Sequence, residues 1–191
     1  MGEFETGYME YLKNKNHQQK IQNEQVGKSV HFIITGGTID SYYDGVLDTV
    51  VPSKMSNIPE YIRSLKLYCK VAFTQICMKD SRNLNENDLK QILETIENSP
   101  INKIIVTHGT YTMPHTARYL KEKLRSRKTV ILTGSLIPLS IVNSDGGFNI
   151  GVSMAKLQHL GNGVFVCMNG EIFDADRVTK LTGIGVFSSI Q

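Results

Sequence analysis

The chain has 191 residues, 40% of them hydrophobic and 20% charged, which is enough to build one globular domain around a hydrophobic core. Its formal net charge is only +3 and its lysines and arginines are scattered, which argues against nucleic acid as a partner. No window approaches the roughly 18 consecutive apolar residues of a membrane span, so we expect no membrane association.

The first 28 residues are polar and show no apolar periodicity, so we expect a mobile tail at 1–28 and a single domain at 29–191. The tail also lacks the basic and apolar blocks of a secretory signal. Apolar runs then predict β-strands at 30–35, 67–76, 103–107, 129–133 and 163–168. Helical spacing between the runs predicts helices at 57–66, after Asn85, after Pro114 and at 144–160.

The predicted helices have start signals and apolar stripes. Asn85 is an N-cap residue type, with Asp88 three residues later, and the stripe after it consists of Leu89, Ile92, Leu93 and Ile96. The helix at 144–160 is expected to bury Phe148, Val152 and Ala155. Strands alternating with such helices indicate an α/β fold, with an open, mostly parallel sheet and helices on both faces, in the three-layer Rossmann- or flavodoxin-like manner.

Small and hydroxyl-bearing residues follow the predicted strands. These segments are Thr35-Gly36-Gly37-Thr38, Lys79-Asp80-Ser81-Arg82, Thr107-His108-Gly109-Thr110, Thr133-Gly134-Ser135 and Asn169-Gly170. In an open parallel sheet these points lie along the carboxyl edge, where ligands bind. For one such loop, ordinary turn chemistry is the better explanation. Five of them on one edge favour a shared binding crevice.

Several common sites are excluded or disfavoured. The chain has no P-loop, no GxSxG elbow and no His-Glu-x-x-His motif. "TGGTID" at 35–40 lacks the glycine spacing of a dinucleotide-binding motif, so a nucleotide-binding module is the weaker alternative. Three separated cysteines, Cys69, Cys77 and Cys167, show no metal-ligand spacing, and their odd number fits buried thiols in a reducing cytoplasm. We therefore expect no metal and no cofactor.

After these exclusions, a reaction that uses a hydroxyl nucleophile remains possible. A threonine hydroxyl is barely ionised at neutral pH, so it needs a base and an oxyanion site to attack an amide. Backbone N–H groups in the glycine turns can supply the oxyanion site, and a desolvated lysine can supply the base. Lys180, in "DADRVTKLTG", is a candidate, although a lone lysine is usually a surface charge and spacing alone does not select it.

At these residues the chain resembles the bacterial L-asparaginase family of threonine amidohydrolases. "TGGTID" at 35–40 resembles the first threonine motif of the family, and "VTHGTYTM" at 106–113 resembles the second, usually written VTHGTDTM. "MKDSRNL" at 78–84 resembles the serine-bearing substrate loop. "LTGSLIP" and "SDGGFN" within 132–149, and "MNGEIFDADRVTK" at 168–180, resemble the segments that lead to the catalytic lysine. The pieces occur in the family's order over residues 30–187.

The resemblance implies a role for each matching residue. Thr38 would be the nucleophile, Thr110 and Lys180 would form the second hydroxyl–amine pair, and Ser81 would hold the substrate's α-carboxylate. Tyr43 would be the tyrosine of a mobile lid, with Tyr42 as its substitute. The other residues expected to bind substrate are Gly37, Asp80, Gly109 and Tyr111.

Two features depart from the family pattern. Tyr111 stands where the family has an aspartate that binds the substrate ammonium, and losing such a charge-assisted contact costs about 1.5–3 kcal/mol. An inactivating substitution and natural divergence toward another amide both explain this change. The chain also ends near "TGIGVFSSIQ", like the short single-domain asparaginases without a C-terminal domain, equivalent to the N-terminal domain of larger relatives. By analogy we expect a homo-oligomer.

The resemblance thus implies a cytoplasmic, cofactor-free enzyme that converts L-asparagine and water to L-aspartate and ammonia. One alternative is a hydrolase of another small amide, such as glutamine or an asparagine derivative. The other is a ligand-binding protein whose activity is weakened by Tyr111.

Overall fold

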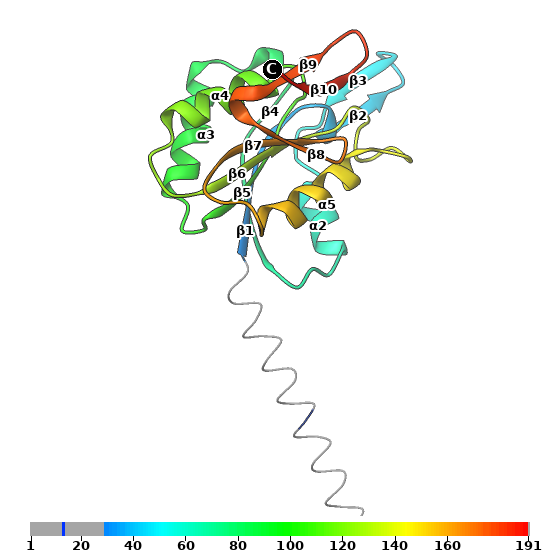
Figure 1. Cartoon of the computed structure of the whole chain (residues 1–191). Helices are drawn as coiled ribbons and strands as arrows, with labels where there is room; N and C mark the ends of the chain where they lie inside the picture. The colour runs from blue at the N-terminus through cyan, green and yellow to red at the C-terminus, as the bar shows by residue number, and fades with distance from the viewer. Residues whose placement is uncertain (1–12, 14–28, 191) are drawn as a thin grey trace, which may run out of the picture.

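Six strands form the central sheet of the computed structural model, which describes residue 13 and residues 29–190 (Figure 1). The tail predicted at 1–28 lies outside the described residues, except for residue 13. The strands are β1 (Ser29–Gly36), β4 (Lys70–Lys79), β5 (Lys103–Thr107), β6 (Thr129–Thr133), β7 (Gly163–Met168) and β8 (Glu171–Asp174). Their spatial order is β4-β1-β5-β6-β7-β8, and only β8 runs antiparallel to its neighbour. The predicted open, mostly parallel sheet is confirmed.

Helices cover both faces of this sheet, as the sequence predicts (Figure 1). One face carries α3 (Glu86–Asn98) and α4 (Met113–Lys123), and the other carries α2 (Ile58–Ser64) and α5 (Gly146–Leu157). Successive residues of a central strand enter different cores, so that Ile104 lies in the first core and Ile105 in the second. Strands buried on both faces read as continuous apolar runs, which is why these runs were visible in the sequence.

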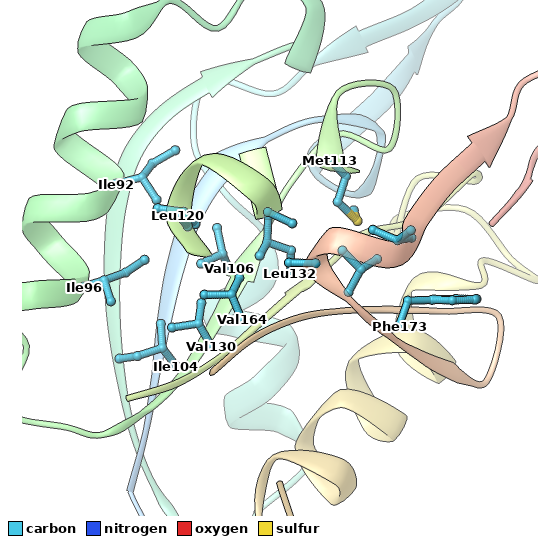
Figure 2. Close-up of a cluster of buried hydrophobic side chains, with 14 of the residues drawn as sticks. Ile92, Ile96, Ile104, Val106, Met113, Leu120, Val130, Leu132, Val164 and Phe173 are labelled. Atoms are coloured by element: carbon cyan, nitrogen blue, oxygen red, sulfur yellow. The ribbon is translucent and has the colours of Figure 1, made fainter. Parts of the chain in front are cut away.

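The core beneath α3 and α4 fixes the position of the central strands. Figure 2 shows Ile92 of α3 and Leu120 of α4 above Val106 of β5. All three side chains are completely buried. Burying such a side chain stabilises the fold by about 1.5–3 kcal/mol. The carboxyl ends of the strands are therefore held on a rigid platform. Among the described helices, none is long and apolar enough to cross a membrane.

Two predicted elements differ from the structure. The strand expected at 67–76 begins and ends later, at Lys70–Lys79, because it follows its neighbour β1 from Ser29↔Lys70 to Gly36↔Lys79. The helix expected at 144–160 is shorter, and the prediction of its buried face is wrong. Phe148 is 60% exposed and Ala155 is exposed, whereas Val152 is partly buried.

The inner face of α5 is partly polar, which explains that error. Asn149 and Ser153 are completely buried in place of Phe148 and Ala155. Asn149 donates from Nδ2 to the Gly134 carbonyl at 3.0 Å and accepts the Asn169 N–H at 3.0 Å. These bonds satisfy backbone groups at the ends of β6 and β7, a task that an apolar residue cannot perform.

Two short antiparallel hairpins were not predicted. They are β2 (Ser41–Asp44) with β3 (Thr49–Pro52), and β9 (Val178–Leu181) with β10 (Val186–Ser189). Single-turn 3-10 helices occupy Thr38–Asp40, Ser81–Asn83 and Ala175–Arg177. Each strand of the hairpins has only four residues, of which at most one is buried, so neither apolar length nor strong alternation marks it.

The predicted N-cap of α3 is present as a reciprocal capping box. The Asn85 side chain accepts the Asp88 N–H at 3.0 Å, and the Asp88 carboxylate accepts the Asn85 N–H at 2.9 Å. Lys79, at the end of β4, also donates to Asp88 at 2.7 Å. The cap therefore ties the start of α3 to the strand that leads into the Ser81 loop.

We predict that Asn85→Ala lowers the free energy of unfolding by about 1 kcal/mol, because it leaves a helix N–H without its acceptor. Urea unfolding followed by circular dichroism measures the change. Asn98→Ala, at the exposed end of the same helix, is the control and should change stability by much less. Equal losses in the two variants would contradict the capping role.

Candidate active site

A cavity of about 240 Å³ lies where the carboxyl ends of the parallel strands meet. Its lining comes from the loops after β1, β4, β5 and β6 and from one residue of β9. The lining residues are Gly37, Thr38, Asp80, Ser81, Arg82, Gly109, Thr110, Tyr111, Leu136 and Lys180. The structure thus brings together every predicted site residue except Tyr43. Their roles in catalysis and binding remain predictions.

Glycines allow the three innermost loops to approach one another. Gly37 has φ +81° and ψ −174°, a conformation open almost only to glycine, and a Cβ there would lie 2.3 Å from the Gly109 Cα. A Cβ on Gly109 would in turn lie 2.7 Å from the Ser81 Cβ. The loops after β1 and β5 therefore meet backbone to backbone, and the Ser81 side chain of the loop after β4 packs against Gly109, which places Thr38, Ser81 and Thr110 around one cavity.

The closest polar contact in the cavity joins Lys180 to Thr110. The Lys180 Nζ lies 2.7 Å from the Thr110 Oγ1, although the two residues are far apart in the sequence. Thr110 is 6% exposed, and Lys180 is half-buried. Burial lowers the pKa of Lys180 from its ordinary value, because the charged ammonium loses solvation. A lysine in this state can take up a proton from a neighbouring hydroxyl.

Thr38 occupies the first position of a single-turn 3-10 helix, directly after Gly37. Its side chain lines the cavity and is half-buried. No residue that the structure describes forms a hydrogen bond with its hydroxyl, so the oxygen is open toward the cavity. This turn is held from below by Asp40, whose buried carboxylate accepts the Ser56 hydroxyl at 2.8 Å and the Asn57 N–H at 2.9 Å.

Ser81 presents a donor to the same cavity. Its Oγ accepts the Thr112 N–H at 3.3 Å, and its backbone carbonyl accepts the Thr112 hydroxyl at 2.9 Å. The Ser81 hydroxyl proton is therefore free to point at a ligand, since one lone pair already has a partner. Ser81 is 3% exposed, so a carboxylate bound here would be largely removed from water.

The charged wall of the cavity consists of Asp80, Arg82 and Lys180, with the Tyr111 ring among them. Asp80 and Arg82 form a bidentate ion pair. The Arg82 Nε donates to the Asp80 Oδ1 at 3.0 Å, and the Arg82 Nη2 donates to the Asp80 Oδ2 at 2.8 Å. The hydrogen bonds from Arg82 lower the pKa of Asp80. The Tyr111 ring centre lies 5.5 Å from the Arg82 Cζ and 6.0 Å from the Lys180 Nζ, within the range of cation–π attraction.

Tyr43 lies outside the cavity lining, on the β2–β3 hairpin. It is 54% exposed, and its hydroxyl donates to the Asp48 carboxylate. Tyr43 pairs with Val50, so the two side chains share one face of the hairpin, and Val50 lines a second hollow that adjoins Thr38. Tyr42 lies on the opposite face. The hairpin geometry therefore favours Tyr43 over Tyr42 as the tyrosine on the cavity side.

Sequence reasoning missed two residues of the lining, Arg82 and Leu136. Arg82 stands next to Ser81, and a cation beside a serine that is predicted to bind a carboxylate could have been recognised in the sequence. Leu136 had no such signal. It is brought to the cavity by Asp145, whose carboxylate accepts the N–H groups of Leu136 and Ile137 at 2.9–3.0 Å.

His108 supports the Thr110 loop from within the core. Its Nδ1 lies 2.7 Å from the Gly109 carbonyl, which only accepts, so Nδ1 carries the proton and Nε2 accepts the Thr116 hydroxyl at 3.0 Å. Complete burial lowers the pKa of His108 to about 4. The ring is therefore neutral at pH 7 and positions the loop rather than transferring protons.

Comparison with known proteins identifies the family of this chain. The model of the asparaginase N-terminal domain matches residues 29–190, so the chain belongs to the asparaginase family. "L-asparaginase 2" of Escherichia coli is 29% identical over 173 residues, which are 85% of this chain and 49% of the relative. The chain thus spans about half the length of the curated relatives that it matches.

Solved structures agree on the fold. A probable cytoplasmic L-asparaginase from Campylobacter jejuni superposes with a TM-score of 0.73 at 27% identity, covering 85% of this chain and 53% of that one. The thermostable L-asparaginase from Thermococcus kodakarensis gives a TM-score of 0.74 at 24% identity, covering 85% and 51%. The mostly parallel sheet described above is therefore the asparaginase N-terminal architecture.

We predict that Gly37→Ala destabilises the protein by at least about 2 kcal/mol, because any side chain there is strained and meets the Gly109 backbone. Gly151→Ala is the matched control, since a Cβ at this position of α5 would meet nothing within 4 Å. It should be neutral or slightly stabilising. Thermal and urea unfolding of both variants measure the difference, and equal midpoints would refute the packing argument.

Proposed function

We propose that this asparaginase-family chain hydrolyses a short carboxamide through a threonine nucleophile, with L-asparagine giving L-aspartate and ammonia as the reference reaction. The observation that supports this most directly is the 2.7 Å contact between the Lys180 amine and the Thr110 hydroxyl, in a cavity that also holds the open Thr38 hydroxyl. Family membership supports amide chemistry, and the L-asparaginases among the relatives suggest the reference substrate.

In the proposed reaction the Thr38 Oγ attacks the carboxamide carbon and loses its proton to the Lys180–Thr110 pair. Backbone N–H groups of the adjacent glycine turns stabilise the negative charge that develops on the amide oxygen. The C–N bond then breaks, the nitrogen takes up a proton and leaves as ammonia, and an ester to Thr38 remains. A water molecule, deprotonated by the same pair, hydrolyses this ester and restores the Thr38 hydroxyl.

The partly buried amine is suited to this task. A fully charged ammonium cannot accept a proton, and burial of Lys180 favours its neutral form. The neutral amine can accept the Thr110 hydroxyl proton across the 2.7 Å contact, so the pair acts as one base. Ser81 would hold the substrate carboxylate through its free hydroxyl proton, which fixes the amide end near Thr38.

Two alternatives share the same cavity. A different short amide, such as glutamine or an asparagine derivative, would use the same nucleophile and base. A binding protein would retain the ligand contacts without turnover. Both alternatives are suggested by Tyr111, because this tyrosine replaces a carboxylate in the family motif.

We predict that ammonia release from the best substrate falls to background in Thr38→Ala, because the nucleophilic oxygen is removed. Thr49→Ala, an exposed threonine of β3, is the control and should retain full activity. An enzyme-coupled ammonia assay on the purified chain measures both variants. Activity in Thr38→Ala equal to that of the unmodified chain would rule out Thr38 as the nucleophile.

The rate should rise with pH through the pKa of Lys180, because the neutral amine is the active form. Since burial lowers this pKa, the rise is expected below the ordinary lysine value of about 10.4. Lys180→Arg should lower kcat by about 100-fold or more, because a guanidinium does not deprotonate. Lys156→Arg, on the outer side of α5, is the control. A pH profile left unchanged by Lys180→Arg would contradict the proposed base.

A further inference from the structure

The cavity offers no unpaired carboxylate to a ligand. Of the residues that the structure shows lining it, Asp80 alone has a carboxylate. Its Oδ1 accepts the Arg82 N–H at 2.9 Å and the Arg82 Nε at 3.0 Å, and its Oδ2 accepts Nη2 at 2.8 Å. Both oxygens are therefore already occupied by a guanidinium and a backbone N–H.

The position that the family fills with an aspartate is here occupied by an uncharged ring that lies beside two basic side chains. The Tyr111 ring contacts Arg82 and Lys180 on the cavity wall, at 5.5 and 6.0 Å. A ligand ammonium beside this ring would lie near the Arg82 guanidinium and the Lys180 amine, and the only carboxylate among the described lining residues, that of Asp80, is already paired. The ammonium would lose hydration without gaining an anionic partner, which is costly in a partly buried site.

The same wall has donors to spare for an anion. A guanidinium has five N–H donors, and the ion pair with Asp80 uses the one on Nε and one on Nη2. The remaining three belong to a side chain that lines the cavity and is 63% exposed. Together with the free proton of Ser81, Arg82 can thus bind a carboxylate in the two-pronged manner typical of arginine.

We propose that this site selects short carboxamides that bear a carboxylate but no charged amine, such as the monoamide of succinic acid. The carboxylate would lie between Ser81 and Arg82, the Tyr111 ring would cover the carbon chain, and the amide would lie at Thr38. This inference rests on the proposed amide hydrolysis for its reaction, but the charge selectivity is a property of binding and can be tested without turnover.

The first experiment compares succinamate with L-asparagine, which differ only by the α-ammonium. We expect kcat/KM for ammonia release to be at least tenfold higher for succinamate. Tyr111→Asp should shift the ratio of the two kcat/KM values toward L-asparagine by about 10- to 100-fold, because it supplies the missing anion. Tyr68→Asp makes the same chemical change at an exposed position between α2 and β4 and should leave the ratio unchanged.

The second experiment tests Arg82. Arg82→Gln should raise KM for succinamate by tenfold or more, because two charge-assisted donors to the carboxylate are lost. Arg127→Gln, at an exposed position before β6, is the control and should leave KM unchanged. Equal KM values in the two variants would overturn the assignment of Arg82 to the carboxylate.

The third experiment separates selectivity from catalysis. Thermal unfolding of the full chain is measured with succinate and with L-aspartate, which correspond to the two reaction products. A larger rise in the unfolding midpoint with succinate supports the inference, even if no amide is hydrolysed and the proposed function fails. A larger rise with L-aspartate overturns the inference, and ammonia release from L-asparagine in that case leaves the proposed function standing.

Discussion

The site depends on one steric constraint, the close contact of three loops at the carboxyl edge of the sheet. Gly37 and Gly109 are almost in contact, and Gly109 lies against Ser81, so no side chain fits between the segments. Each loop follows a strand that is fixed by an apolar core on either face. Rigid strands bring the loops to the same place, and the absence of Cβ atoms lets them meet. The hydroxyl groups of Thr38, Ser81 and Thr110 are then close to one another without any flexible segment having to order.

The Lys180 amine is positioned by a different part of the structure. Lys180 lies on the short β9–β10 hairpin, outside the central sheet, and reaches Thr110 through a single 2.7 Å contact. This hairpin is anchored where Arg118 of α4 donates to the Val178 carbonyl at 3.0 Å, and Val178 itself is completely buried. The proposed base is thus positioned by a helix that belongs to the first core. The geometry of the candidate site at this edge therefore depends on the packing of the face that carries α3 and α4.

The sequence predicts the parts of this arrangement that short-range patterns encode. Continuous Ile and Val runs mark strands buried on both faces, and Asn85 with Asp88 marks the start of α3. Glycine followed by threonine after two strands indicates a shared edge. The hairpins and the inner face of α5 were not predictable in this way, since exposed four-residue strands lack a strong pattern and Asn149 is buried to satisfy loop backbone groups. Lys180 was predicted only from the family resemblance. Its contact with Thr110 joins two residues that are far apart in the sequence, so no short-range pattern indicates it.

Replacing the family aspartate by Tyr111 affects two properties of the site, its attraction for an ammonium ligand and the charge state of Lys180. A carboxylate at this position would attract an ammonium ligand, and it would also stabilise the charged form of the neighbouring Lys180. The tyrosine ring provides no full negative charge, so burial remains the cause that sets the pKa of Lys180, and it acts to lower that pKa. In the proposed reaction, the replacement would therefore weaken recognition of an α-amino acid while it favours the neutral amine that a base requires. The contact between Lys180 and Thr110 and the open hydroxyl of Thr38 are both present beside Tyr111, so the proposed base and nucleophile keep their positions without a carboxylate at residue 111. The proposed site thus combines its hydroxyl and amine groups with a wall suited to a ligand that lacks an ammonium group.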